Sequence, residues 1–205
     1  MKPPFVYGID FGTSNSALAI LDIQKNEIVK LLSVPSLLFF PESGKSMPQH
    51  FVGEAAIENY LSNNMEGRFM KSVKRVLPNK SFRDTQIGMK RFTAEELVAL
   101  IIRELKQMAD AYLGADIRTA VIGRPVVFDE NPEKDALAQE RLSRAASIAG
   151  FDEVYFQLEP IGAAFTYERN LNKPEKVLFV VFIPPQVVWP LAVYDVVVIF
   201  VRFYF

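Results

Sequence analysis

The chain has 205 residues, half of them hydrophobic, which is enough to bury the core of one large domain or of two small subdomains. Its 23 basic and 24 acidic residues nearly cancel, and this balance argues against a nucleic-acid partner or a polybasic membrane face. The absence of cysteine excludes disulfides and thiolate metal sites, and it fits a reducing, cytoplasmic compartment.

The first predicted elements are two strands, near residues 5–10 and 15–22, joined by a short polar turn. The connecting segment, GIDFGTSNS at residues 8–16, contains an acid, two glycines and several hydroxyls. A bare hairpin turn requires only Gly or Asn, so this turn carries more chemistry than its geometry needs. We therefore predict a ligand site here. A polar hairpin without a ligand is the alternative.

Five residues of this turn fit a site for a phosphate and a metal ion. The carboxylate of Asp10 suits a hydrated divalent cation, because such cations take oxygen ligands. Gly12 lets the backbone come close to a ligand. The backbone N–H groups and the hydroxyls of Thr13, Ser14 and Asn15 can surround a phosphate, as concave runs of backbone amides do.

The rest of the chain is predicted to alternate helices and strands. A capping box at Thr93 and Glu96 indicates the start of a long amphipathic helix, which Gly114 ends. After residue 116 the order is strand, helix, strand, helix, strand, and this alternation calls for parallel pairing with right-handed crossovers. His50, the single histidine, is expected in a surface loop. The other predicted elements are strands at 27–32, 118–123, 153–158 and 177–183, and helices at 54–64, 132–149 and 160–170.

The segment at 8–16 resembles the first phosphate motif of the seventy-kilodalton heat-shock chaperones, whose superfamily includes actin, hexokinase and the sugar kinases. Two further segments follow in the family's order, and the resemblance covers roughly residues 1–181. It implies an α/β fold: an actin-like ATPase lobe of the ribonuclease-H type, with a mixed sheet, flanking helices and a smaller inserted α+β subdomain. Residues 1–40 and 116–183 would form the core lobe, and 41–115 the inserted subdomain.

The second segment, residues 70–78, resembles the chaperone stretch in which a lysine before Arg-Leu or Arg-Val reaches the terminal phosphate of the nucleotide. By that pattern Lys74 is the match, and Lys71, one turn away, is the second choice. A lysine can stabilise charge that develops on a transferring phosphoryl group. Without the motif around it, the same stretch would read as a solvated basic face.

The third segment resembles the first connecting region of the family. There the resemblance matches Pro125 to a conformational switch, and Glu159 to the acid that contacts the attacking water and the hydration shell of the metal. Leu158 replaces the family's Asn, and Ile161-Gly162 replace Thr-Ala, so this member is divergent. Independently of the family, Glu159 followed by Pro160 signals a helix start, where an acid and a proline are both favourable.

The chain departs from the family at the second phosphate strand. Where the family has Asp-Ile-Gly-Gly-Gly-Thr, residues 182–187 read Phe-Ile-Pro-Pro-Gln-Val. Proline removes an N–H donor and restricts φ, so this segment cannot cradle a phosphate in the same way. The apolar tail at 184–205 has strand composition and no match to the family. It is either a variant ending or, as we favour, out-of-frame or erroneous sequence, and an exposed edge there would promote aggregation.

The resemblance implies a chaperone-type ATPase that binds ATP and Mg²⁺, with client proteins or co-chaperones as partners. Asp10 would orient the hydrated metal, residues 13–15 would hold phosphate, Lys74 would stabilise the transferring charge, and Glu159 would position water or metal ligands. Such catalysis works by positioning and electrostatics. Because the second phosphate motif is missing, we expect weak or absent ATPase activity from this chain. Two alternatives stay open: a sugar-kinase-like phosphotransferase, and a non-enzymatic nucleotide-sensing or interaction protein.

Overall fold

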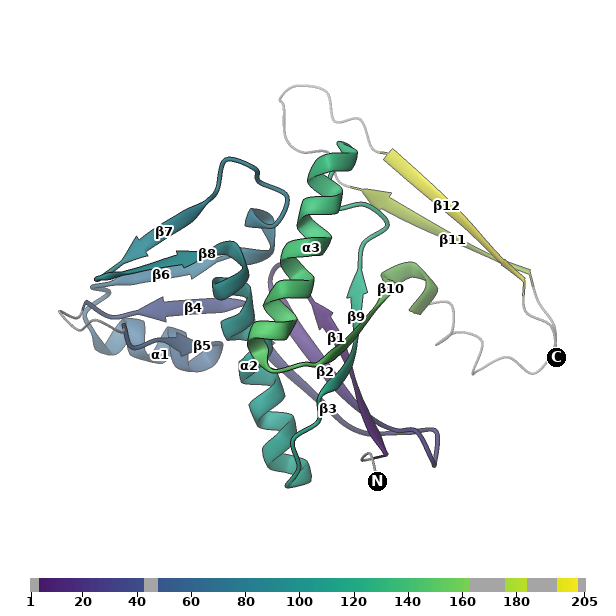
Figure 1. Ribbon diagram of the computed structural model, residues 1–205, viewed down its shortest axis with the longest axis horizontal. Coiled ribbons are helices and arrows are strands. Elements are labelled where there is room, and N and C mark those ends of the chain that lie inside the picture. The colour runs from purple at the N-terminus through teal and green to yellow at the C-terminus, as the bar shows by residue number, and fades with distance from the viewer. Residues whose placement is uncertain (1–3, 43–47, 163–175, 184–194, 203–205) are drawn as a thin grey trace. The chain divides into compact units, whose positions relative to one another are not determined.

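The computed structural model describes residues 4–42, 48–162, 176–183 and 195–202 (Figure 1). The chain divides into two compact units, Met1–Phe156 and Gln157–Phe205. The first unit contains the main sheet and most of the predicted site.

A five-stranded mixed sheet of order β10-β9-β1-β2-β3 forms the centre of the first unit. β1 (Phe5–Phe11) pairs antiparallel with β2 (Asn15–Asp22) and parallel with β9 (Thr119–Arg124). β3 (Glu27–Pro35) pairs antiparallel with β2 and forms one edge, while β10 (Glu153–Leu158) forms the other. Because β1 and β9 are parallel, their carboxyl ends lie at the same edge of the sheet.

Two long helices lie over one face of this sheet and pack against each other (Figure 1). α2 (Ala94–Leu113) begins with the predicted capping box: the Glu96 amide donates to Thr93 Oγ1 at 3.3 Å, and the Thr93 amide donates to the Glu96 carboxylate at 2.9 Å. It ends at Gly114, where φ is +65°, as predicted. α3 (Pro132–Ala149) also has the predicted bounds.

Between β3 and α2 the chain forms smaller elements, which lie beside α2 on the left of Figure 1. The strands of this segment form a three-stranded sheet of order β5-β4-β6 and a β7-β8 hairpin. His50 is exposed in the coil that precedes β5, as predicted. The elements are β4 (Leu37–Phe40), β5 (Phe51–Val52), α1 (Glu54–Ser62), β6 (Arg68–Lys71), the 3₁₀ helix η1 (Val73–Val76), β7 (Asp84–Ile87) and β8 (Lys90–Thr93).

The division into a core lobe at 1–40 and 116–183 and an insertion at 41–115 stays a prediction. α2, which that division assigns to the insertion, packs on the main sheet. One tie between them is the hydroxyl of Tyr7 in β1, which donates to the carboxylate of Asp110 in α2 at 2.8 Å.

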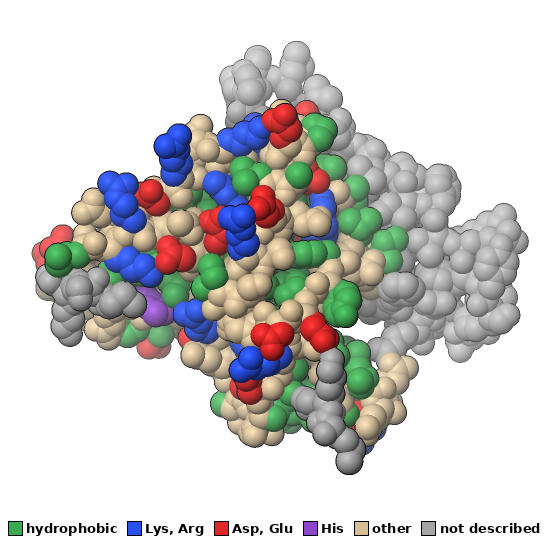
Figure 2. Space-filling model, viewed as in Figure 1, with side chains coloured by type: hydrophobic (Ala, Val, Ile, Leu, Met, Phe, Trp, Pro, Cys, Tyr) green, Lys and Arg blue, Asp and Glu red, His purple; other side chains and the backbone are tan. Residues whose placement is uncertain are grey.

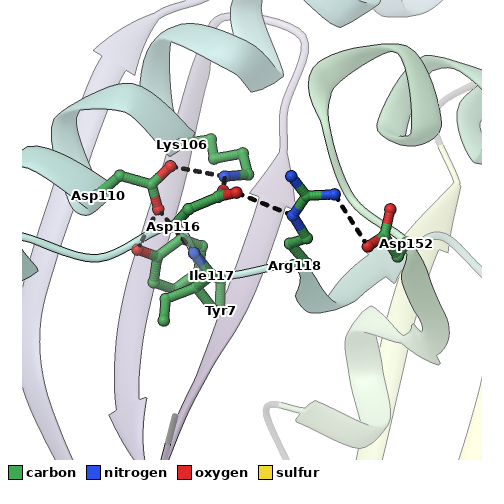
Figure 3. Close-up of polar contacts among 7 residues, drawn as sticks. All are labelled: Tyr7, Lys106, Asp110, Asp116, Ile117, Arg118 and Asp152. Carbon is green, nitrogen blue, oxygen red and sulfur yellow. Dashed lines mark hydrogen bonds and ion pairs between the residues drawn. The ribbon is translucent and has the colours of Figure 1, made fainter. Parts of the chain in front are cut away.

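A polar network surrounds this contact (Figure 3). The buried ammonium of Lys106 donates to Asp110 at 2.6 Å and also pairs with Asp116. Arg118 bonds to Asp116 at 2.8 Å and continues the network toward β10. Burial and then the hydrogen bond with Asp110 raise the pKa of Tyr7. The network therefore joins the end of α2 to the starts of β1 and β9.

The second unit contains a short helical stretch at residues 159–162, β11 (Lys176–Ile183) and β12 (Asp195–Arg202). β11 pairs antiparallel with β12. This pairing was not predicted. The expected parallel pairing of strand 177–183 with the preceding strands, most of which belong to the first unit, stays a prediction. Both strands are runs of β-branched and aromatic residues, and the tail offers β11 a partner of equal strand preference. The predicted helix at 160–170 is described only as far as residue 162.

Candidate functional site

The β1–β2 turn places the predicted phosphate and metal residues at one edge of the main sheet. Asp10 is exposed near the end of β1, while its neighbours Ile9 and Phe11 are buried. This alternation is the period of a strand, and it turns the carboxylate away from the core. In the turn that follows, Thr13 is half-buried, and Ser14 is exposed together with Asn15 at the start of β2.

The geometry of the turn requires a glycine at position 12 even without a ligand. A Cβ atom at this position would lie 2.1 Å from the carbonyl oxygen of Asn15, far inside van der Waals contact. The turn therefore closes so tightly that no side chain fits at Gly12. Its predicted role in close approach to a ligand stays a prediction.

Two buried serines, Ser16 and Ser36, stabilise the turn through hydrogen bonds on its core side. The Ser36 hydroxyl donates to the carbonyl oxygen of Gly12 at 2.8 Å, and the Ser36 amide donates to the carbonyl oxygen of Ser14 at 2.8 Å. The hydroxyls of Ser16 and Ser36 lie 2.8 Å apart. Sequence reasoning missed this pair, although Ser16 stands at an inward-facing position of an alternating strand. A serine at such a position signals a buried hydrogen bond.

The carboxyl end of β9 lies next to Asp10. In the parallel pair, Asp10 is opposite Gly123, and Pro125 follows β9 directly after Arg124. The structure thus brings the predicted switch proline to the edge of the sheet that carries Asp10 and the turn.

Arg124 fixes the loop that begins with Pro125. Its guanidinium binds both carboxylate oxygens of Asp135, at 2.9 and 3.0 Å, contacts Gln139, and donates to the carbonyl oxygen of Pro125 at 3.0 Å. Asp135 also accepts the Phe128 amide at 2.6 Å. Both contacts to Asp135 come from the Nη2 atom of Arg124, and charge-assisted hydrogen bonds of this kind are stronger than neutral ones. The start of α3 therefore holds both ends of residues 124–128.

Lys74 lies half-buried in η1, and its ammonium lies 6.0 Å from the centroid of the Phe128 ring. The guanidinium of Arg124 lies 5.2 Å from the same centroid. Both distances fall within the range of a cation–π interaction. The structure thus connects Lys74 to the loop after Pro125. Lys71, the second choice, is exposed at the end of β6.

Glu159 belongs to the second unit, where it is exposed and is the first helical residue after β10. The buried Pro160 follows it, so the predicted helix start is confirmed. The first unit alone therefore brings together Asp10, the turn and Pro125, and links Lys74 to them through Phe128.

Among the described residues, no three His, Asp or Glu side chains cluster as a ready-made metal site. A cation at Asp10 would complete its coordination with water and phosphate oxygens. Mg²⁺ is usually bound in that way, through one or two carboxylates and the substrate phosphates.

Figure 2 shows basic and acidic side chains intermixed over the face that carries α3, so this face has no patch of a single sign. In the part of the chain that the structure describes, no helix is long and apolar enough to cross a membrane.

The model of the family described as Hsp70 protein matches residues 6–183. The chain belongs to the Hsp70 family. It is similar to chaperone protein DnaK of Thermosipho melanesiensis (33% identity over 184 residues), of Methanothermobacter thermautotrophicus (32% over 187) and of Thermotoga maritima (33% over 186). These matches cover 86%, 87% and 86% of this chain, but 28%, 29% and 28% of the relatives. The chain spans less than a third of the length of these relatives.

Membership of the Hsp70 family confirms the resemblance that the three motifs indicated, and with it the actin-like α/β fold. The residues that sequence reasoning missed are those that hold the motifs in place. Ser16 and Ser36 support the β1–β2 turn, while Arg124, Phe128 and Asp135 hold the loop after the predicted switch proline.

Proposed function

We propose that this chain binds ATP together with Mg²⁺ at the β1–β2 turn. We propose that it acts as the nucleotide-binding part of an Hsp70-type chaperone. The observation that carries the proposal is the turn itself: an exposed carboxylate at the end of β1, followed by a backbone too tight for a side chain at Gly12 and by exposed polar residues. Family membership favours this function over the sugar-kinase alternative.

The proposed roles follow from the chemistry of each residue. Asp10 orients the hydrated cation, and Thr13, Ser14 and Asn15 contact phosphate oxygens through backbone N–H groups and hydroxyls. The ammonium of Lys74 stabilises charge on the terminal phosphate. When bound, Mg²⁺ supplies positive charge that neutralises the phosphates.

Two further residues have roles that depend on the family pattern. Glu159 contacts the attacking water or the water shell of the cation, and Pro125 acts as the switch between nucleotide states. The position of Pro125, beside Asp10 at the carboxyl edge of the sheet, supports its part in this proposal.

We also propose that hydrolysis by this chain is weak or absent. The motivating sequence is Phe182-Ile183-Pro184-Pro185, which replaces an aspartate and glycines that the family uses for metal and phosphate. Such a chain would bind nucleotide without rapid turnover, which is also the behaviour of a nucleotide sensor.

The names of the relatives support client proteins or co-chaperones as partners, because each relative is called a chaperone. We propose a cytoplasmic location, which the cysteine-free composition supports. Neither a nucleic acid nor a membrane enters the proposal as a partner.

The test is a calorimetric titration of the pure chain with ATP and MgCl₂, alongside Asp10→Ala and the control Glu27→Ala. Glu27 is a second exposed acid on the same sheet, on β3. We expect binding by the wild type and the control, and a loss of about tenfold or more for Asp10→Ala, since a charge-assisted contact is removed. Equal binding by Asp10→Ala and the wild type would refute the site.

The same samples are assayed for phosphate release. We expect turnover near the background rate. Clear magnesium-dependent turnover that Asp10→Ala abolishes would contradict the proposal of weak hydrolysis while supporting the site. Turnover that requires an added sugar would instead support the phosphotransferase alternative.

A further inference from the structure

Arg141, in the middle of α3, is a buried arginine whose partners are backbone carbonyls. Only 8% of its surface is exposed. Its Nη1 atom donates to the carbonyl oxygens of Val76 at 2.9 Å, Leu77 at 3.1 Å and Asn79 at 3.0 Å, and its Nη2 atom donates to that of Phe82 at 2.8 Å. One guanidinium thus donates to four carbonyl groups of a single segment.

That segment begins at Val76, the last residue of η1, the 3₁₀ turn that carries Lys74. A helix end leaves carbonyl groups without partners, and isolated 3₁₀ turns are short and have poor hydrogen-bond geometry. η1 is entered through Ser72 in the left-handed region, at φ +58°, a conformation that costs free energy in a residue with a side chain. The conformation around Lys74 therefore depends on support from outside the turn.

The charge of Arg141 is balanced across the core. The carboxylate of Glu95, at the start of α2, lies 3.9 Å from its Nε atom. Removing this guanidinium should be costly, because Glu95 would lose its counter-charge and all four carbonyl groups would lose a charged donor, although those of Val76 and Asn79 also accept backbone amides.

We propose that Arg141 is a positioning residue that holds Lys74 where its ammonium meets the terminal phosphate of the nucleotide. The inference rests on the proposed function of Lys74. It adds that α3 positions this lysine by two routes. Arg141 fixes the backbone at the end of η1 and just after it, and Asp135 fixes the amide of Phe128, whose ring lies near the Lys74 ammonium.

The first test measures the backbone and needs no nucleotide. Hydrogen–deuterium exchange is compared for the wild type, Arg141→Met and Arg144→Met. Arg144 is a control on the same helix; it is 63% exposed and pairs with Glu140. We expect amides of residues 75–82 to exchange about tenfold or more faster in Arg141→Met, because four carbonyl groups lose a charged donor. In Arg141→Met, the amides of β1 should exchange at the wild-type rate. In Arg144→Met, the amides of residues 75–82 should do so as well.

The second test asks whether this support reaches Lys74. Affinities for ATP and for ADP are measured with Mg²⁺ for the wild type, Lys74→Ala, Arg141→Met and the double variant. A residue that acts through Lys74 should lower ATP affinity by about tenfold and spare ADP affinity, because only ATP has the terminal phosphate. The double variant should be no worse than Lys74→Ala alone.

Arg141→Lys separates positioning from general stability. It keeps the charge but loses the planar fork that reaches several carbonyls at once, so we expect partial rescue of both readouts. If Arg141→Met does not fold, Arg141→Lys decides: unchanged exchange at residues 75–82 refutes the proposal, and faster exchange there with an unchanged melting temperature supports it.

The outcomes also separate this inference from the proposed function. Unchanged exchange in Arg141→Met, or equal losses of ATP and ADP affinity, would overturn the positioning role. If the wild type binds no nucleotide, the proposed function fails and the role toward Lys74 fails with it. Fully additive losses of ATP affinity in the double variant would show that Arg141 acts independently of Lys74.

Discussion

The buried hydroxyl of Ser36 donates a hydrogen bond of 2.8 Å to the carbonyl oxygen of Gly12. Since a hydroxyl carries one proton, the proton in the 2.8 Å contact between Ser16 and Ser36 comes from Ser16. Two hydroxyls in series thus fix the backbone to which we assign the phosphate contacts. A buried polar network of this kind gives rigidity when every member is satisfied.

Ser36→Ala should therefore destabilise the protein and weaken nucleotide binding. The substitution leaves the Gly12 carbonyl without its donor and the Ser16 hydroxyl without its acceptor. We expect a loss of about 1–3 kcal/mol in the free energy of unfolding, the cost of unsatisfied buried groups. Urea unfolding measures it, with the exposed Ser33→Ala on β3 as control. Equal unfolding midpoints for Ser36→Ala and Ser33→Ala would contradict the prediction.

Gly12→Ala should damage the turn, whereas Gly8→Ala in the preceding strand, β1, should not. The new Cβ at Gly12 would meet the Asn15 carbonyl oxygen at 2.1 Å, so the backbone must shift, at a cost of roughly 1–3 kcal/mol typical of overpacking. At Gly8 the nearest atom is the Cβ of Ala19, at an ordinary 4.0 Å. Thermal unfolding and ATP titration compare the two variants. If the two variants have the same melting temperature and the same ATP affinity, the tight closure of the turn does not exclude a side chain at Gly12.

Local signals made much of this fold predictable. Thr93 and Glu96 lie three residues apart, and Gly114 follows the last helical turn, so short-range chemistry alone located both ends of α2. The mixed sheet was implied by the family resemblance. The antiparallel pairing of β11 with β12 was not predicted, because strand preference says that a segment will pair but does not name its partner.

The site was predictable in its chemistry but not in its supports. Asp10 and Pro125 were identified from motifs, and the parallel register of β1 and β9 brings them to one edge. The donors behind them could not be read in the same way. Ser36 is 24 residues from Gly12 in the sequence, and Arg141 is 65 from Val76, so only the folded chain brings each pair together.

Lys106→Met should be strongly destabilising. Its ammonium is buried and bridges Asp110 and Asp116 (Figure 3). Removing it leaves the largely buried Asp110 carboxylate without its cation, and breaking such a pair costs roughly 3 kcal/mol. Arg118→Met, which removes an exposed cation of the same network, should change stability little. Urea unfolding of both variants tests this, and equal midpoints would show that burial of the pair does not matter.

The same network should make the free energy of unfolding depend on pH, with one acid limb and one alkaline limb. Hydrogen bonds from Lys106 and then from Arg118 lower the pKa of Asp116. A lowered pKa means that the stabilisation is present above the unfolded value of about 3.9 and is lost as the pH falls through the folded value. Burial opposes the charge of Lys106, but its hydrogen bonds with Asp110 and Asp116 outweigh burial and raise its pKa. That stabilisation is present below about 10.4 and is lost as the pH rises through the folded value.

The measurement is the difference in unfolding free energy between the wild type and Lys106→Met across the pH range. We expect a plateau through neutral pH that shrinks below about 4 and above about 10. The acid limb should be the smaller, because Asp116 is half exposed and solvent screens its ion pair. Tyr7→Phe separates the alkaline ionisation of Tyr7, whose raised pKa also acts on that side. A difference that stays constant from about pH 2 to about pH 12, beyond the ordinary pKa values of both groups, would mean that Lys106 stabilises the fold through packing of its chain and not through its charge.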